Sequence, residues 1–113
     1  RQNKNAWPNA FRSARFVPAV EYLQANRHRT LLIQELDKTL KGFDVYVTPS
    51  FSKNLTMTNL TGHPCVVLPN GFRAEGRPLS ITFMGKLFGE AKLLQVAKAY
   101  QDATDFHKKH PKL

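Results

Sequence analysis

Few residues in this chain have types and spacings that could act on a substrate. His107 and His110 offer two imidazoles three residues apart, but a metal site needs three or four ligands and no carboxylate or thiol cluster accompanies them. Cys65 lies within the most apolar run, so we interpret it as a buried, unreactive thiol. His63 could face a pocket, although a loop histidine bonded to the backbone is the simpler interpretation. The sequence therefore predicts neither a metal nor a cofactor.

The segment from Asn59 to Phe72 carries the clearest structural signals. Two glycines and two prolines flank or follow the run Cys65–Leu68, where they restrict the backbone and favour extended conformations. Polar and apolar residues do not alternate within this run, so we expect a strand covered on both faces. After a turn at Gly76, the alternating run Leu79–Met84 predicts a second strand, antiparallel to the first.

The rest of the chain is predicted to alternate helix and strand. Apolar residues recur at helical spacing from Pro18 to Lys41, with Gly42 as the residue that ends this helix. Aromatic and β-branched residues from Phe43 to Thr48 predict a strand, and a last helix should begin after Gly89. The eleven residues from Ser50 to Leu60 show no element and are predicted to form a loop, which at this length is often functional.

Length and composition limit the class of protein. At 113 residues, 42% of them hydrophobic, the chain is one globular domain at most. No apolar run reaches the ~18 to 20 residues of a membrane span, and the amino end lacks the apolar core of a secretory signal, so no membrane partner is expected. A single cysteine leaves the compartment open, with the cytoplasm slightly favoured.

The formal net charge of +9 raises the question of nucleic-acid binding. The 17 lysines and arginines are scattered along the chain, whereas nucleic-acid binders concentrate them on one face among exposed aromatic rings. Most aromatic residues here fall at positions typical of a core, such as Tyr22 on a helix stripe and Phe83 in a strand. We therefore expect a solvated basic surface, or a face for a missing acidic partner, in preference to a nucleic-acid interface.

The order of these motifs resembles the carboxy-terminal region of amidase signature enzymes, over roughly residues 7 to 107. Each motif is weak alone, but their order is specific, and the helix from Pro18 and the strand from Phe43 also fit. Cys65, Ser80 and Gln101 depart from the residues common in the family, which leaves the subfamily open. The matching positions are Asn59, Gly62, Pro64, Pro69, Gly71, Phe72, Gly76, Pro78, Gly85, Glu90, Leu93, Leu94 and Ala97.

This resemblance implies an α/β/α sandwich on a mixed sheet, of which this chain would hold about three strands and two to three helices. Residues 1–113 would be the carboxy-terminal segment of an amidase signature domain whose amino-terminal catalytic core is missing. The family uses a serine nucleophile, a second serine in a cis peptide and a lysine base. None of these can be assigned here, because no serine of this chain lies in a glycine-rich Ser-Ser segment. The chain alone is therefore predicted to hydrolyse no amide.

The resemblance also implies a binding role for the segment before Gly62. In the family this segment lies beside the substrate-binding region, so Thr58, Asn59 and Leu60 are candidate pocket residues. The partners implied are the remainder of the amidase core and a small amide substrate, and the isolated chain is expected to self-associate. The alternative interpretation is a freestanding basic α/β module that binds nucleic acid or a protein partner.

Overall fold

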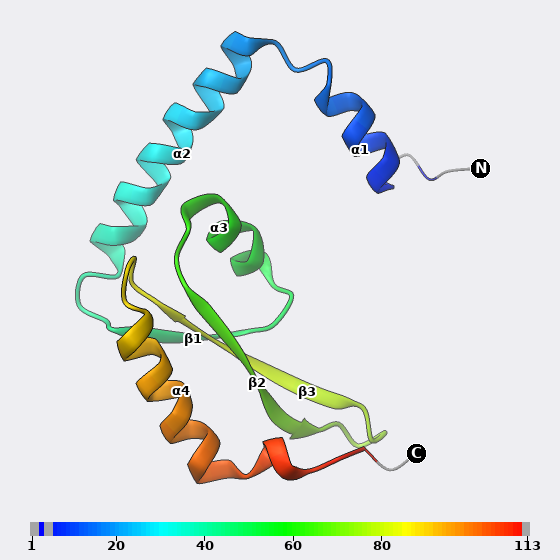
Figure 1. Ribbon diagram of the computed structural model, residues 1–113, viewed down its shortest axis with the longest axis vertical. Coiled ribbons are helices and arrows are strands. Elements are labelled where there is room, and N and C mark those ends of the chain that lie inside the picture. Colours follow the sequence, from blue (N-terminus) through cyan, green and yellow to red (C-terminus); the bar gives the residue numbers. More distant parts are fainter. Residues whose placement is uncertain (1–2, 4–5, 112–113) are drawn as a thin grey trace.

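The structure is a computed structural model that describes residue 3 and residues 6–111. It is an α/β arrangement of one three-stranded sheet and helices on both of its sides (Figure 1). Within the described residues the elements are α1 (Trp7–Ala14), α2 (Ala19–Thr39), β1 (Val45–Pro49), α3 (Lys53–Thr61), β2 (Cys65–Phe72), β3 (Pro78–Gly85), α4 (Glu90–Thr104) and a short 3-10 helix, η1 (Phe106–Lys108).

The sheet has the strand order β1-β3-β2, and both pairings are antiparallel, as predicted for β2 and β3. Phe83 in the central strand pairs with Val47 on one side and Val66 on the other. The register of β2 shifts between Pro69 and Phe72, where Gly71 has a φ of 88°. At Gly71 an added Cβ would lie 3.3 Å from the Phe106 ring, so a glycine lets η1 pack closely on the irregular end of β2.

Helix α4 covers one face of the sheet, and its side chains pack against the central strand to form part of the core. The rings of Phe83 and Tyr100 pack with centroids 5.2 Å apart, and Leu93 packs against Gly85. Leu93, Ala97, Phe83, Met84 and Leu40 are the buried hydrophobic residues of the described chain.

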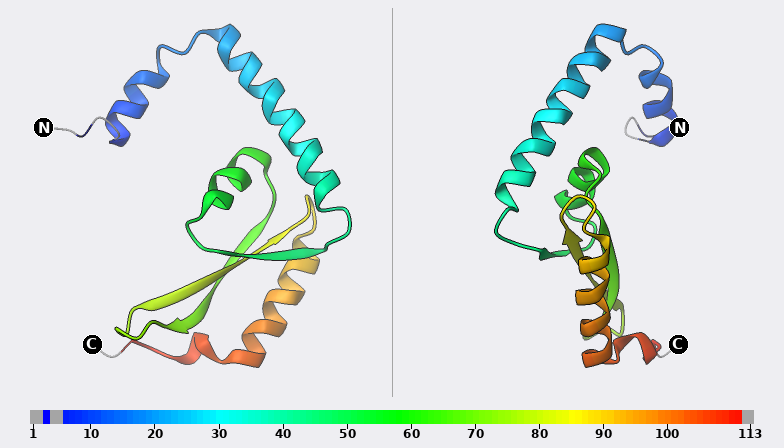
Figure 2. Two further views of the ribbon diagram at one scale, coloured as in Figure 1. Left: turned by 180° about the vertical axis from the view of Figure 1, so that it is seen from behind. Right: turned by 60° about the vertical axis from the view of Figure 1, so that its left-hand side comes forward.

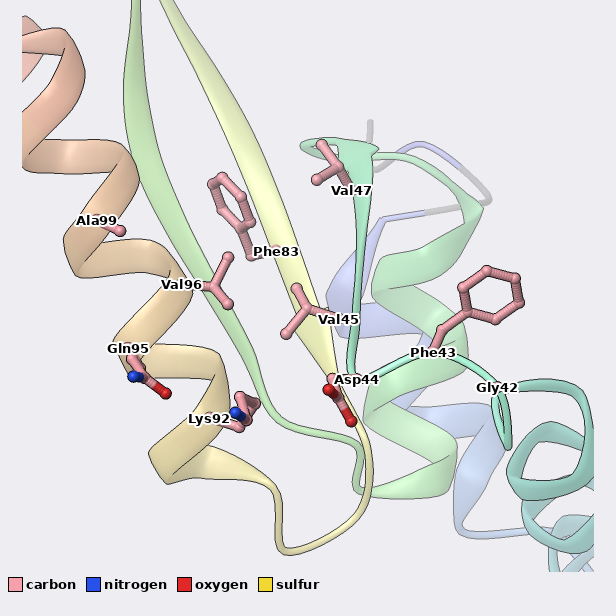
Figure 3. Close-up of a pocket in the computed structure, with 10 residues that line it drawn as sticks. All are labelled: Gly42, Phe43, Asp44, Val45, Val47, Phe83, Lys92, Gln95, Val96 and Ala99. Carbon is pink, nitrogen blue, oxygen red and sulfur yellow. The ribbon is translucent and has the colours of Figure 1, made fainter.

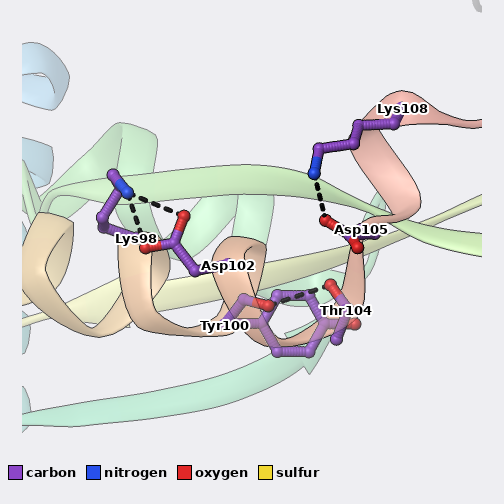
Figure 4. Close-up of polar contacts among 6 residues, drawn as sticks. All are labelled: Lys98, Tyr100, Asp102, Thr104, Asp105 and Lys108. Carbon is purple, nitrogen blue, oxygen red and sulfur yellow. Dashed lines mark hydrogen bonds and ion pairs between the residues drawn. The ribbon is translucent and has the colours of Figure 1, made fainter.

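Two ion pairs mark the end of α4 (Figure 4). Lys98 Nζ lies 2.5 Å from Asp102 within the helix, and Lys108 Nζ lies 2.7 Å from Asp105 just beyond it. These pairs are exposed, so each contributes at most about 1 kcal/mol.

Helix α1 and the amino half of α2 extend away from the sheet (Figures 1 and 2). Helix α2 contacts α3. Arg29, at the middle of α2, donates a hydrogen bond of 2.6 Å from Nε to the Leu60 carbonyl oxygen. Arg29 therefore links α2 to the backbone near the end of α3. Large apolar side chains of α1, of the link that follows it and of the amino half of α2 are exposed, including Trp7, Phe11, Phe16, Tyr22 and Leu23. This part of the chain has an apolar surface that the described residues do not cover.

The structure corrects two predictions about the chain from Ser50 to Leu68. The predicted loop from Ser50 to Leu60 contains α3, because Ser52 caps its amino end and Gly62 at φ 76° ends it. The side chains of Cys65 and Val67 are exposed, the latter by 54%, so β2 is not covered on both faces. β2 is an edge strand here, and α3 covers this part of it only incompletely.

Two smaller corrections concern α2. The helix ends at Thr39 with Leu40 as its C-cap, and Gly42 does not adopt a positive φ. Tyr22 was predicted to be core-like but is 63% exposed, because the amino half of α2 has no packing partner among the described residues, whereas Phe83 is buried as predicted. No helix in the described part of the chain combines the length and the apolar character that a membrane crossing requires.

Candidate functional site

A group of hydroxyl and amide side chains gathers where β1 ends and α3 begins. Ser50 Oγ lies 2.8 Å from Thr82 Oγ1 of the central strand. Asn54 Nδ2 donates to Ser52 Oγ at 2.9 Å and also to Thr48 Oγ1. We call Thr48, Ser50, Ser52, Asn54 and Thr82 the hydroxyl cluster.

Local sequence explains why these side chains meet. β1 ends at Pro49, which cannot donate to a continued ladder, and the chain then turns through Phe51 at a φ of 56°. The turn brings Ser52 back beside Thr48, with 3.2 Å between their hydroxyl oxygens. Ser52 also accepts from the backbone N–H of Asn54 at 3.4 Å, which starts α3. The cluster is thus held from both the strand and the helix.

A small cavity of about 40 Å³ lies beside the cluster, between α3 and the sheet. Thr48, Asn54 and Thr58 line its polar side, and residues such as Val67 and Met84 line its apolar side. A water molecule occupies ~30 Å³ in the liquid, so this volume suits a water rather than a substrate. The described residues alone therefore do not enclose a substrate pocket here.

The cluster is neutral. Tyr46 extends it, because its hydroxyl donates to Asn54 Oδ1 at 3.3 Å. Burial raises the pKa of Tyr46, and the nearby Cys65 adds to this, so the phenol stays protonated at neutral pH. The contacts of the Ser50 and Ser52 hydroxyls are with Thr and Asn groups rather than with a base. Such a site can hold a neutral polar group by hydrogen bonds, but it lacks the base that a serine nucleophile needs.

The three predicted pocket residues point in different directions, because consecutive residues of a helix are about 100° apart. Thr58 is buried, lines the small cavity and donates to the Asn54 carbonyl oxygen at 3.1 Å. Asn59 is exposed. Leu60 is 45% exposed and lies on the other side of α3, in an open groove that Leu32 also lines. Only Thr58 therefore lies beside the hydroxyl cluster.

Sequence reasoning missed the cluster itself. Its one sequence signal is the density of Ser, Thr and Asn directly after a strand that ends at a proline. Hydroxyl and amide side chains compete for backbone groups and are typical of turns and caps, so this signal does not separate a binding site from a helix start.

His63 is buried at the junction of α3 and β2. Its Nδ1 lies 2.9 Å from Thr61 Oγ1, and the Thr61 hydroxyl donates to the Met57 carbonyl oxygen at 2.8 Å. Because that hydroxyl has one proton, Nδ1 carries the proton of the imidazole and Nε2 is an acceptor, which has no partner among the described residues. His63 is therefore bonded to a side chain, not to the backbone as predicted.

A larger and more open groove of about 670 Å³ lies between β1 and α4. Val45, Phe83 and Val96 point towards one another in it, and Asp44 and Lys92 lie at one end (Figure 3). Its walls are mainly apolar. His107 and His110 are exposed near the carboxyl end, and the described residues contain no group of three metal-ligating side chains.

Comparison with known proteins finds relatives that match most of this chain. No family model matches the chain. It is 37% identical over 112 aligned residues to a glutamyl-tRNA(Gln) amidotransferase subunit of Oceanobacillus iheyensis, a match covering 81% of this chain and 23% of that protein. The same amidotransferase subunit from Trichormus variabilis is 36% identical over equal shares of each chain.

A solved structure gives the same result for the fold. The structure of an amidase family protein from Bacillus anthracis str. Ames matches with a TM-score of 0.75 and 29% identity, over 87% of this chain and 20% of that one. Fold and sequence thus both match a segment of proteins of the amidase family. The chain belongs to the amidase signature family, as its motifs predicted, and it spans less than a quarter of the length of the curated relatives it matches.

Proposed function

We propose that this chain is one part of a longer amide hydrolase, in which it forms a wall of the substrate site and supplies neither nucleophile nor base. One observation carries the proposal: most of the chain matches proteins of the amidase family, while it spans only 23% of a curated relative. The hydroxyl cluster agrees with this role, since it presents hydrogen-bonding groups without a base. A neutral amide is the ligand that such neutral groups suit.

The exposed apolar surfaces support the proposal that the rest of a longer protein packs against this chain. Trp7, Phe16 and Val67 are exposed by 75%, 84% and 54%, and they lie on α1, the α1–α2 link and the sheet. Large apolar surface of this kind is uncommon on a complete soluble domain and marks an interface. The partner we propose is the rest of the same amidase chain.

The substrate site would then lie between this chain and that remainder. Thr58 would contribute through the cluster, and Asn59 and Leu60 through the outer surface of α3. The relatives' name points to glutamine as one amide to test, beside simple aliphatic and aromatic amides. A cytoplasmic location remains a proposal that rests on the single cysteine.

The test compares the full-length protein with residues 1–113. Both are assayed for release of ammonia from glutamine, propionamide and benzamide. We expect turnover of at least one amide by the full-length protein and none by residues 1–113. Turnover by residues 1–113 that survives repurification and is lost on Ser50→Ala or Ser52→Ala would contradict the proposal, and so would a full-length protein that releases no ammonia.

A further inference from the structure

Strand β1 has a free edge. In the strand order β1-β3-β2 it pairs with β3 alone among the described residues. In an antiparallel pair every second residue directs its N–H and C=O groups away from the partner strand. β1 therefore presents a row of backbone groups at its outer edge, and such groups are satisfied by water or by a further strand.

The open groove between β1 and α4 lies along this strand (Figure 3). Val45 and Val47 alternate with Tyr46, so they share the face of the sheet on which Phe83 packs against Tyr100 of α4. Helix α4 contacts β2 and β3 more than β1, and it leaves Val47 54% exposed. The layer that covers this face of the sheet is therefore incomplete beside β1.

The sequence of β1 lacks the features that protect edge strands from pairing. It contains no lysine, no bulge and, before its last residue, no proline. Asp44, which precedes the strand, is paired with Lys86 at 3.6 Å. β2 is different, because its register shifts between Pro69 and Phe72 and η1 packs on that end. Of the two edges of the sheet, β1 is thus better suited to take a further strand.

We propose that a β-strand from the rest of the protein pairs with the free edge of β1 and places apolar side chains in the groove beside α4. This inference rests on the proposed function, because the strand belongs to the part of a longer chain of which these residues span only 23% in a curated relative. A strand fits better than a helix, since it supplies both backbone partners for the edge and alternating side chains for the groove.

The first measurement follows the backbone of β1 in the full-length protein by hydrogen–deuterium exchange resolved to single residues. We expect all the amides from Val45 to Thr48 to exchange about 100-fold or more slowly than in an unstructured peptide of the same sequence. A free edge would instead give alternation, with every second amide exchanging nearly as fast as in the peptide. Such alternation in an active full-length protein would contradict this inference alone.

The second measurement identifies what fills the groove. Photo-leucine, whose diazirine reacts with neighbouring atoms on illumination, replaces Val47 in the full-length protein, and mass spectrometry locates the cross-link. We expect a link to a segment of the same polypeptide outside residues 1–113. Tyr46 is the matched control, because it is adjacent in β1 but its hydroxyl donates to Asn54 of α3 at 3.3 Å. Photo-leucine in place of Tyr46 should link to α3.

Other cross-links would overturn the inference. A link from the Val47 site to a second copy of the chain, or only to residues 1–113, would show that no strand from the rest of the protein occupies the groove. A link outside residues 1–113 combined with alternating amide exchange would show that the groove is covered without pairing to β1. Absence of amide hydrolysis by the full-length protein would contradict the proposed function, whereas the exchange and cross-linking results decide this inference separately.

Discussion

One buried side chain, His63, should make the stability of this fold depend on pH. Burial lowers its pKa below the usual value of 6.5, although the charge of Asp37 acts in the opposite direction. Its Nδ1 proton is committed to Thr61, so protonation would place a charge on Nε2, which lacks a partner among the described residues. The folded protein therefore resists a proton that the unfolded chain accepts.

The consequence is a loss of stability in mild acid. Because the folded pKa is the lower one, the stabilisation is fully present above pH 6.5 and is lost as the pH falls from there towards the folded pKa. Melting temperatures measured from pH 7.5 to pH 5 should fall more steeply for the wild type than for His63→Gln, which keeps a polar group without a titration in this range. Parallel curves for the two proteins would show that His63 does not titrate as the structure implies.

At the scale of elements, glycine and proline allowed much of the fold to be predicted. The long helix, the three strands and the last helix were predicted within a few residues, because their ends are marked by proline or glycine. Helix α3 was missed, since its sequence is rich in Thr and Asn, which have weak helix propensity. The cap at Ser52 and the left-handed Gly62 define α3 instead, and neither is distinctive in a run of turn-forming residues.

The contribution of the α3 N-cap to stability can be tested by substitution. Ser52→Ala removes the N-cap and the hydroxyl that contacts Thr48 and Asn54, and it should cost about 1 kcal/mol of unfolding free energy. Ser80→Ala, at an exposed position of β3, is the matched control and should change stability by less than about 0.5 kcal/mol. Urea unfolding of the two variants measures the difference, and equal effects would argue against Ser52 as the structural start of α3.

At the scale of the whole molecule, β2 is the element whose predicted burial this chain alone does not provide. The run Cys65–Leu68 has the continuous apolar pattern of a strand with two covered faces, yet Cys65 and Val67 are exposed in this structure. The candidate site could be predicted only in part for the same reason. Thr58 lies beside the cluster, but the proposed pocket includes further protein, whose residues this sequence does not contain.

If the rest of the protein covers β2, one substitution should have different effects on the full-length protein and on residues 1–113. Val67→Asp should cost several kcal/mol in the full-length protein, where an unpaired charge would be buried. In residues 1–113 the same change should leave the melting temperature nearly unchanged and should reduce self-association, because Val67 is 54% exposed there. Ala74→Asp, in the exposed turn between β2 and β3, is the control. Thermal melts and sedimentation of both forms test this, and an equally stable full-length Val67→Asp variant would contradict the covered face.

The central claim is that the nucleophile lies outside residues 1–113, and labelling the nucleophile tests it directly. The full-length protein is reacted with a fluorophosphonate, which modifies activated serines, and the modified peptide is identified by mass spectrometry alongside the loss of amidase activity. We expect a single modified serine outside residues 1–113, with protection by a competing amide. Inactivating modification of Ser13, Ser50, Ser52 or Ser80 would contradict it, because this chain would then hold the nucleophile itself.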